Sequence, residues 1–541
     1  MKKATLYILL ALSLSRCAQI TPLTGGKKDA TPPKVLSALP ANASVNFNSK
    51  QIVIQFNEYI QLRDITNQFI ITPQTKELPD IEAQGKILKI NFTESLLPNT
   101  TYKLAFGNAI VDLHEGNAIS NFEYVFSTGN IIDSLKLTGK IINATNKKVA
   151  ANLLVGLYSS LANDSIVYKE KPLYITRTTT DGYYEFNYLP TNSFKLVAID
   201  DANKNLMYDG SNEQIAFLNN PANPSDSAKQ ELLLFKETPS KQFIKKTTSN
   251  EYGKELIIYN KPCNDITTIT WKKMEGVYHI NDLQDSLTVY YKNAFDTLEV
   301  IVHRSTKSDT LTLKIPSLIE YEKLKKNNRL KYLINSNLAS SFPYYETPSI
   351  KLNFPFNEEE IQKEKITCYK LIDSIKIKQP YEIIANEKQV NAFYIKTKLE
   401  KETLYQITIS KGAFTDFTGK ANDSLDVKFK TTTPDDYAQL NIKLLFPKKE
   451  NYIVLLLNEK EQLVAKQFIS FSLASTNEKI LNFTNLLPGN YFVRVVEDVN
   501  KNNGFDTGNF LMKLQPEIIY INQLPIKLLA GWEIESEWNI K

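Results

Sequence analysis

The chain has 541 residues, of which 42% are hydrophobic and 23% are charged, as is usual for globular protein. This length suggests about three to five domains of about 100–200 residues each, and the 28 Tyr and 27 Phe residues suit β-rich cores. The formal net charge is +5, and it falls to +2 if residues 1–16, which contain the cations Lys2, Lys3 and Arg16, are removed. So small a net charge gives no electrostatic reason to expect nucleic-acid binding.

The first residues of the chain predict an export signal. Lys2 and Lys3 precede a short apolar stretch, residues 5–15, which is too short for a durable membrane span. The stretch ends in Leu-Ser-Arg-Cys (14–17), which resembles a bacterial lipobox, although Arg16 stands where a small residue is usual. The resemblance implies a lipoprotein signal peptide over residues 1–16 and fatty acids, such as palmitate, on Cys17. The alternative is ordinary secretion with an incidental cysteine.

Residues 17–33 hold Gly-Gly and Pro-Pro without apolar periodicity, and we predict a tether there. Apolar and polar residues then alternate in QIVIQF (51–56), KILKINF (86–92), TYKLAF (101–106) and NFEYVFST (121–128). Alternation with a period of two, interrupted by turn residues, is typical of half-buried antiparallel strands. The pattern predicts a β-sandwich over residues 34–129.

The same pattern returns later in the chain. Residues 96–128 align without gaps on residues 399–431, and seven of the 33 positions are identical, including Tyr102 with Tyr405 and Phe126 with Phe429. Upstream, IVIQF (52–56) matches IKLNF (350–354). We interpret this as an internal repeat, with a second copy of the domain over residues 331–434.

A different module follows each copy. Both modules show a turn, a strand, a Leu-Pro turn, a strand and an Asp/Asn loop, in TTTDGYYEFNYLPTNSFKLVAIDDANKN (178–205) and in ILNFTNLLPGNYFVRVVEDVNKNNGFD (480–506). This order predicts related domains over residues 130–235 and 435–541. The stretches ELIIYN, SLTVYY and TLEVIVH predict a further β domain over residues 236–330.

The first domain, with TPPKVLSALPANASVNFNSKQIVIQFNEYI and a closing FEYVFSTGN, resembles the bacterial Ig-like domains that also occur in S-layer proteins. The second kind of module resembles the carboxypeptidase-regulatory or collagen-adhesin B-type (prealbumin-like) β-sandwich, through its T-x-D-G-Y-Y-E-F, L-P and F-x-L strings. Together with the lipobox and tether, the chain resembles the Ig-like-domain lipoproteins of Bacteroidota. The resemblance implies an all-β fold of tandem β-sandwiches and an envelope setting, but no activity. Ala18 after the cysteine implies sorting to the outer membrane.

Two strings of the form Asp-x-Asn-x-Asn-x-x-x-Asp are candidate calcium sites, because calcium binds hard oxygen ligands. The candidate ligands are Asp201, Asn203, Asn205 and Asp209 in the first string, and Asp498, Asn500, Asn502 and Asp506 in the second. Neither string has the Gly and Glu positions of an EF-hand, so the expected affinity is weak, about 10⁻⁴–10⁻³ M. The alternative is a loop in which Asp and Asn bond their own backbone.

Signals for catalysis are weak. The histidines, His114, His279 and His303, fall in different predicted elements, and the sequence contains neither H-E-x-x-H nor G-x-S-x-G. Cys263 and Cys368 belong to different predicted domains, so we expect two buried free thiols rather than a disulfide. Each of the tyrosine doublets at 183–184, 290–291 and 344–345 should direct one ring outward, because neighbours in a strand face opposite sides.

We therefore expect a non-catalytic, lipid-anchored outer-membrane protein without a small-molecule substrate. Its expected role is that of a scaffold or binding subunit of an envelope complex, with an outer-membrane protein as its partner. A surface glycan-binding or adhesive module is the alternative. The sequence leaves open whether the protein faces the periplasm or the exterior.

Overall fold

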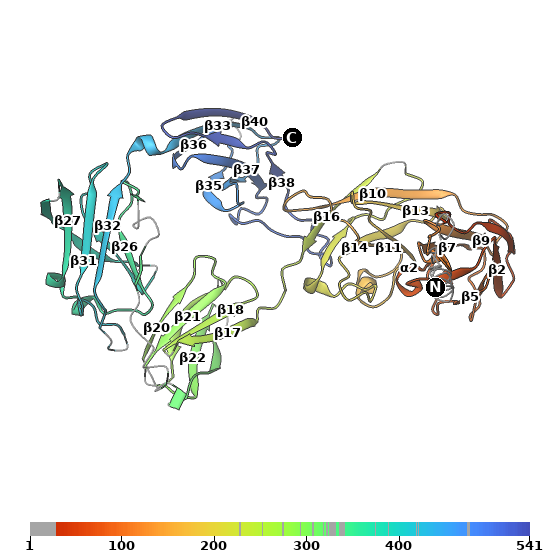
Figure 1. Ribbon diagram of the computed structural model, residues 1–541, viewed down its shortest axis with the longest axis horizontal. Helices are drawn as coiled ribbons and strands as arrows, with labels where there is room; N and C mark the ends of the chain where they lie inside the picture. Colours follow the sequence, from red (N-terminus) through yellow and green to blue (C-terminus); the bar gives the residue numbers. More distant parts are fainter. Residues whose placement is uncertain are drawn as a thin grey trace, which may run out of the picture. The chain divides into compact units, whose positions relative to one another are not determined.

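The structure, a computed structural model, describes residues 29–541 except for gaps at 227–228, 252, 264, 273–274, 293, 306–307, 318, 321–322, 324–331, 335–340, 374, 388, 418, 420 and 473–475. The predicted signal peptide, Cys17 and most of the tether lie outside the described residues. Almost all of the regular structure that is described consists of strands (Figure 1), which confirms the all-β prediction. No helix among the described residues has the length and apolar character required to cross a membrane.

The residues group by their contacts into two units. One comprises Met1–Asn143, Lys148–Phe235 and Phe510–Lys513, and the other comprises Ala144–Lys147, Lys236–Asn509 and Leu514–Lys541. Below, the names first to fifth sandwich denote the described residues within the predicted ranges 34–129, 130–235, 236–330, 331–434 and 435–541. Apart from residues 144–147 and 510–513, the first two sandwiches fall in one unit and the other three in the second unit.

The first sandwich buries the face that its alternating sequence predicts. Its strands are β1 (Val35–Leu39), β2 (Gln51–Phe56), β3 (Ile60–Leu62), β4 (Ile70–Thr72), β5 (Asp80–Gln84), β6 (Ile87–Asn91), β7 (Thr101–Gly107), β8 (Ile110–Asp112) and β9 (Phe122–Ser127), with the short helix α2 (Ile65–Gln68) between β3 and β4. The sheets β1-β2-β6-β5 and β4-β7-β9 share one core. In β2, Ile52, Ile54 and Phe56 are fully buried, because alternate side chains of a strand share a face.

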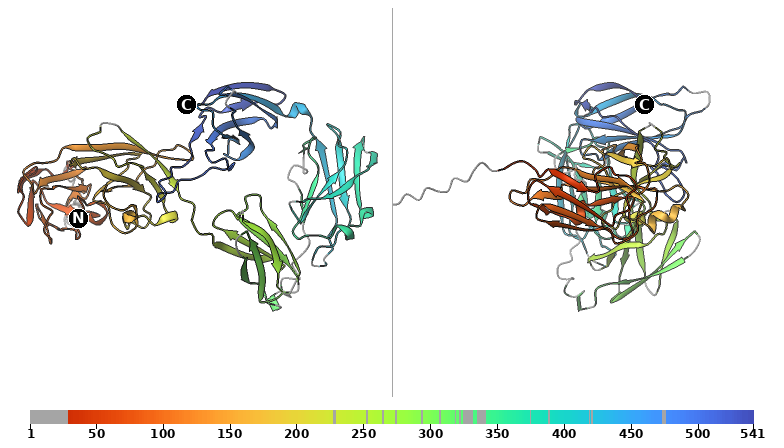
Figure 2. Two further views of the ribbon diagram at one scale, coloured as in Figure 1. Left: turned by 180° about the vertical axis from the view of Figure 1, so that it is seen from behind. Right: turned by 90° about the vertical axis from the view of Figure 1, so that its right-hand side faces the viewer.

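The fourth sandwich repeats the strand orders of the first. Its strands are β24 (Tyr332–Ile334), β25 (Ser341–Phe342), β26 (Ser349–Leu352), β27 (Ile366–Ile372), β28 (Ile375–Gln379), β29 (Glu382–Ala385), β30 (Ala392–Lys396), β31 (Leu404–Ile409) and β32 (Leu425–Thr431). The order β24-β26-β30-β29 corresponds to β1-β2-β6-β5, and β27-β31-β32 corresponds to β4-β7-β9. The left view of Figure 2 shows the layers of this sandwich from behind, in teal.

Equivalent side chains of the two copies make equivalent bonds. The hydroxyl of Tyr102 accepts a hydrogen bond from the Leu97 N–H at 2.9 Å, and that of Tyr405 accepts one from the Glu400 N–H at 2.8 Å. A threonine hydroxyl, Thr128 or Thr431, accepts from the backbone N–H of a residue 28 positions earlier in each copy, at 3.0 and 2.9 Å. These shared contacts support the internal repeat that the sequence predicts.

The second and fifth sandwiches also share one topology. The strands of the second are β10 (Leu135–Asn143), β11 (Leu154–Ser159), β12 (Tyr174–Arg177), β13 (Tyr183–Leu189), β14 (Phe194–Ile199), β15 (Gln214–Phe217) and β16 (Gln230–Lys236). Those of the fifth are β33 (Ala438–Leu445), β34 (Tyr452–Asn458), β35 (Leu463–Ile469), β36 (Glu478–Leu486), β37 (Gly489–Glu497), β38 (Ile519–Ile521), β39 (Ile526–Leu528) and β40 (Glu533–Asn539). In both, the first strand pairs antiparallel with the fourth and parallel with the last, through β10-β13 and β10-β16 or through β33-β36 and β33-β40.

The third sandwich supplies a separate core. Its strands are β17 (Ile244–Glu251), β18 (Lys254–Tyr259), β19 (Ile266–Trp271), β20 (Gly276–Ile280), β21 (Ser286–Tyr291), β22 (Thr297–Arg304) and β23 (Ser308–Lys314). The sheets β17-β18-β21-β20 and β19-β22-β23 bury residues such as Val289 and Val300 between them.

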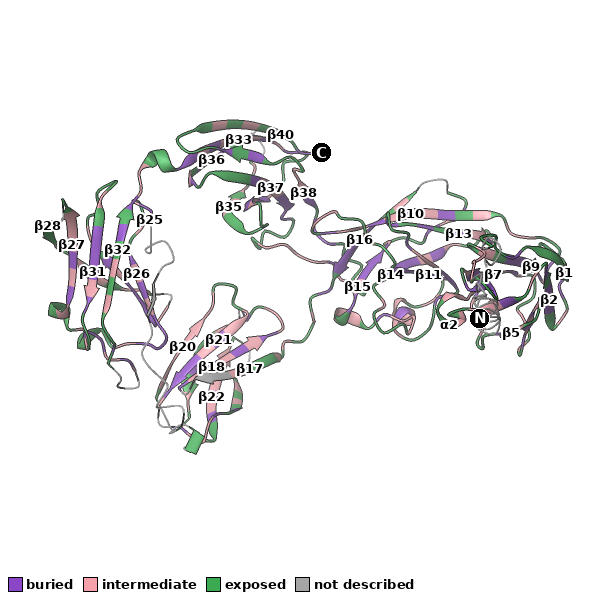
Figure 3. Ribbon diagram, in the orientation of Figure 1, coloured by how far each residue is buried: buried purple, intermediate pink, exposed green. Residues whose placement is uncertain are grey.

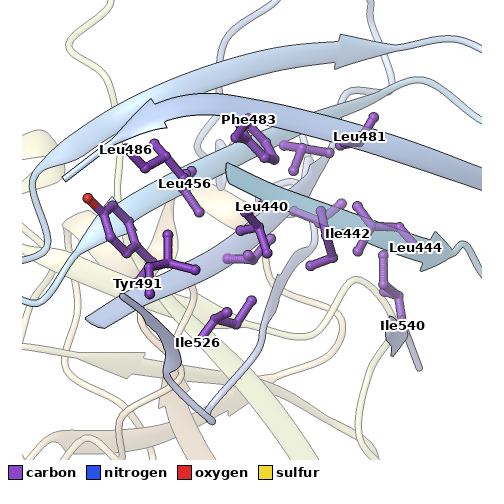
Figure 4. Packing of buried hydrophobic residues seen from close by; sticks show 14 of the residues in the cluster. Leu440, Ile442, Leu444, Leu456, Leu481, Phe483, Leu486, Tyr491, Ile526 and Ile540 are labelled. Carbon is purple, nitrogen blue, oxygen red and sulfur yellow. The ribbon is translucent and has the colours of Figure 1, made fainter. Parts of the chain in front are cut away.

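Burial alternates along strands such as β2 and β33, whereas β11 is buried along almost its whole length (Figure 3). The core of the fifth sandwich shows the packing from close by: Leu440, Ile442 and Leu444 of β33 face Leu456 of β34 and Tyr491 of β37 (Figure 4). Burial of such side chains contributes about 1.5–3 kcal/mol each, which makes these cores the main source of stability.

Candidate functional site

The first Asp/Asn loop follows β14 and leads into β15 of the second sandwich. The carboxylate of Asp201 accepts hydrogen bonds from the backbone N–H groups of Asn205 and Leu206, both at 3.1 Å. The side-chain amides of Asn203 and Asn205 donate to one oxygen of Asp209, at 2.5 and 3.1 Å. The loop thus closes on itself through its own Asp and Asn side chains, as an Asx-turn loop does.

The second loop follows β37 and precedes β38 in the fifth sandwich, and it has the same bonds. The carboxylate of Asp498 accepts from the N–H groups of Asn502 and Asn503, both at 3.1 Å. The amides of Asn500 and Asn502 donate to Asp506 at 2.5 and 2.6 Å. The structure therefore brings together all four predicted ligands of each string, in two matching loops.

Each loop contains one more acidic residue, which the sequence reasoning missed. Glu213 accepts from the N–H groups of Ala202 and Asp209, at 3.3 and 3.1 Å. Glu517 accepts from those of Val499 and Asp506, both at 2.9 Å. These glutamates follow the last Asp of their strings by 4 and 11 positions, so a search for equal spacing passes over them. Their position just before the next strand, β15 or β38, is the signal that both share.

The surroundings of the two glutamates disfavour their charged forms. They are only 6% and 9% exposed. Burial raises the pKa of Glu213, and the carboxylates of Asp209 and Asp201 raise it further. Burial likewise raises the pKa of Glu517, with contributions from Asp506 and Asp498. Each loop therefore gathers three carboxyl groups whose mutual repulsion a bound cation would relieve.

The donor set of each loop, three carboxylates and two amides, suits calcium. The amide nitrogens, however, face Asp209 and Asp506, while the amide oxygens of Asn203 and Asn500 accept backbone N–H bonds. Among the described residues, no group of three or more His, Cys, Asp or Glu side chains is arranged to hold a metal ion. The bonds seen are those of the Asx-turn alternative, and calcium binding stays a prediction.

A carboxylate of the first sandwich has a purely structural use. Asp112, 2% exposed, accepts from the N–H groups of His114, Glu115, Gly116 and Asn117 at 2.6–3.0 Å. Although burial acts to raise it, these bonds lower the pKa of Asp112 to about 2. Gly116 lies at a φ of 78°, and its counterpart Gly419 at 83°, in the left-handed region that favours glycine.

The other candidate residues lie apart. Cys17 is outside the described residues, so its lipidation stays a prediction. Cys263 and Cys368 are free and buried, as predicted. The ring of His303 bonds the hydroxyls of Thr270 and Ser308 at 2.8 and 2.9 Å, which is a structural use within the third sandwich.

One ring of the doublet faces outward in two cases, in β13 as the strand pattern predicts and at 344–345 in a turn between β25 and β26. Tyr183 is 46% and Tyr184 2% exposed, and Tyr345 is 43% exposed beside a partly buried Tyr344. The prediction is wrong for the doublet at 290–291, since both rings are buried, at 2% and 0% exposure. Phe354 contacts Tyr290 edge-on at a centroid distance of 6.1 Å and covers the ring that we expected to face solvent.

A groove of about 490 Å³ lies beside Tyr345, between the fourth and fifth sandwiches. Its lining includes Glu346 of the fourth sandwich and Tyr437, Asn485 and Leu487 of the fifth. The hydroxyl of Tyr345 donates to the backbone oxygen of Asn485 at 3.4 Å and so links the two sandwiches.

Comparison with known proteins identifies one domain family. Residues 29–128 match Big_5, the bacterial Ig-like domain. Among solved structures, the chain is similar to the surface layer protein SbsC (domains 1–6; 12% identity, 87% of this chain and 66% of that chain, TM-score 0.15). It is also similar to an Escherichia coli alpha-2-macroglobulin fragment (9% identity, 48% of this chain and 94% of that chain, TM-score 0.18). A further similar structure is BcpA, the major pilin subunit of Bacillus cereus (10% identity, 75% of this chain and 99% of that chain, TM-score 0.15).

The chain spans 40% of the first matching structure, an N-terminal part of SbsC, and 66% of the longer SbsC structure. No curated protein matches it. The family match covers less than half of the chain, and the TM-scores of these structures all lie below 0.5. The first sandwich of this chain is a bacterial Ig-like domain.

Proposed function

We propose that the protein is a non-catalytic lipoprotein of the outer membrane that serves as a scaffold or binding subunit of a cell-envelope complex. The observation that carries this proposal is the duplicated pair of sandwiches. The first and fourth share their strand orders and tyrosine bonds, and the second and fifth share theirs. Rigid, repeated sandwiches on a short tether hold binding surfaces near the membrane. The lipobox at Cys17 and the Bacteroidota resemblance support the location.

The second and fifth sandwiches are proposed as B-type domains. Their shared strand pairing, with a central strand flanked by one antiparallel and one parallel neighbour, supports one ancestral module. This interpretation adds no activity, because sandwich folds carry many functions.

Affinity capture tests the proposed role. The tagged full chain, isolated from detergent-solubilised membranes, is expected to bring down an outer-membrane protein in a fixed stoichiometry. An unrelated lipoprotein with the same tag, captured in parallel, controls for co-solubilised membrane proteins. Recovery of no such partner would contradict the scaffold role. Retention of the chain on a polysaccharide column would then favour the glycan-binding alternative, which the exposed rings of Tyr183 and Tyr345 support.

We also propose that the two Asp/Asn loops bind calcium weakly, for structural purposes. The carboxylates of Asp201, Asp209 and Glu213, or of Asp498, Asp506 and Glu517, would supply the charge. The Asn amides would have to turn their oxygens inward, in place of the nitrogens that now face the last Asp. The raised pKa values of the glutamates support the proposal, since a cation would stabilise their charged forms.

Calcium is expected to raise the melting temperature of the full chain. With a dissociation constant of about 10⁻⁴–10⁻³ M, 10 mM calcium should add about 1.4–2.7 kcal/mol per loop. Because the glutamates must be ionised, the gain should shrink as the pH falls through their raised pKa values. Scanning calorimetry with calcium, and with magnesium as control, measures this effect.

Glu213→Gln and Glu517→Gln serve as matched variants, since Gln keeps an acceptor but removes the charge. Each should remove the calcium response of its own sandwich only. Without calcium, each variant should lose one of the two backbone N–H bonds that the carboxylate accepts, because Gln replaces one oxygen by an NH2 group. Near neutral pH, removal of a carboxylate with a raised pKa should offset part of that loss. The absence of any calcium shift at 10 mM would rule out the metal and leave the Asx-turn loop.

A further inference from the structure

The tyrosine rings beside the groove at Tyr345 are held in place by contacts with one another. The ring of Tyr345 meets those of Tyr344 and Tyr437 nearly edge-on, both at centroid distances of 5.3 Å. The hydroxyl of Tyr437 shares a hydrogen bond of 2.9 Å with Thr432. The lining also includes Leu487, which is 63% exposed. The groove therefore offers a fixed tyrosine surface at its rim.

The charge of the lining is one-sided. The described residues that line the groove include the acids Glu346 and Asp436 and no Lys, Arg or His. Asp436 is already used, since its carboxylate accepts from the N–H and the hydroxyl of Thr433 at 2.7 and 3.1 Å. An anionic ligand would be repelled by such a lining.

Glu346 is the unsatisfied member of this lining. It is half-buried, and its carboxylate has no hydrogen-bond donor and no cation among the described residues. Burial raises the pKa of Glu346. A partly desolvated, unpaired carboxylate costs free energy, so a ligand that brings a counter-charge would gain more here than a neutral one.

We propose that this groove receives a lysine or arginine side chain from an extended basic segment of a partner protein, with Glu346 as its counter-ion. The rings of Tyr345 and Tyr437, which line the groove, add a favourable surface for the cation, because aromatic faces attract positive charge. The ring of Tyr344 is already covered by Lys401 at 5.1 Å. The hydroxyls of a neutral glycan would bond Glu346 but leave its charge uncompensated. The inference rests on the proposed role as a binding subunit and adds the chemistry of the partner.

Direct binding tests the proposal. The full chain in detergent is titrated calorimetrically with the peptide Gly-Ser-Arg-Ser-Arg-Ser-Gly, with its counterpart carrying Glu in place of Arg, and with a neutral β1,4-linked hexasaccharide. The Arg peptide is expected to bind, and the Glu peptide is not. Glu346→Gln should weaken binding by about tenfold or more, which corresponds to about 1.4 kcal/mol.

Two variants serve as controls. Glu359→Gln removes the same charge from an exposed position of the fourth sandwich outside the groove, and should leave the affinity within about twofold. Glu346→Gln should not lower the melting temperature, because it removes an unpaired carboxylate, so a loss of binding reports the groove.

An Arg peptide that binds no better than the Glu peptide, or whose affinity is unchanged in Glu346→Gln, would overturn the proposal. Tighter binding of the hexasaccharide would assign the groove to glycans. Because the peptides are added to purified protein, this result is independent of affinity capture. A captured partner with no peptide binding would leave the scaffold role intact and reject the groove.

Discussion

Replacing Cys17 with alanine is expected to remove the protein from the outer membrane. The lipobox resemblance makes the Cys17 thiol the acceptor of the diacylglyceryl group, and cleavage then exposes the same residue for a further acyl chain. Each buried CH₂ of such chains contributes about 0.8 kcal/mol, and more than one chain is needed for stable anchoring. Without the thiol, neither the anchor nor the normal processing step is available.

Fractionation of the envelope and mass spectrometry of the N-terminus measure this outcome. The parent chain should appear in the outer-membrane fraction and begin at an acylated Cys17. The Cys17→Ala chain should be absent from the outer-membrane fraction and should lack the acyl mass. It should retain residues 1–16 or be cleaved elsewhere. Ser15→Ala, two positions away, should behave as the parent. A Cys17→Ala chain of normal processed mass in the outer membrane would contradict lipidation.

The repeated strands could be predicted from the sequence because burial in a sandwich has a period of two. Ile52, Ile54 and Phe56 alternate along QIVIQF and are all fully buried in β2. The Asp/Asn strings could be predicted as loops for a similar reason: their short side chains bond the backbone a few positions away. Local chemistry was enough in both cases.

Contacts between distant residues could not be predicted in this way. Glu213 and Glu517 each bond the last Asp of their string, but they follow it at different distances along the sequence. Only the fold shows that the two glutamates are equivalent. Tyr290 is covered by Phe354 of the next sandwich, a contact that no strand pattern contains. The unpaired state of Glu346 depends equally on what two separate sandwiches place around it.

Phe126→Ala is expected to unfold the first sandwich at a much lower temperature than the parent. Phe126 is fully buried. Its ring lies 4.1 Å from that of Phe47 and 5.5 Å from that of Tyr102, which stacks on it. Loss of a buried Phe side chain costs about 3–5 kcal/mol, a large part of the roughly 5–15 kcal/mol that stabilises a domain. Scanning calorimetry of the full chain should show one transition lowered by roughly 10 °C or more.

Phe429→Ala is the matched variant in the fourth sandwich, since Phe429 stacks on Tyr405 at 5.8 Å just as Phe126 stacks on Tyr102. It should lower a different transition, and the two effects should add in the double variant, because distant sites without shared partners are independent. Phe468→Ala, at a position 54% exposed, should change stability by only about 0.5 kcal/mol. If both core variants lowered the same transition, the copies would fold as one cooperative body, and the protein could not present its sandwiches as independent rigid modules.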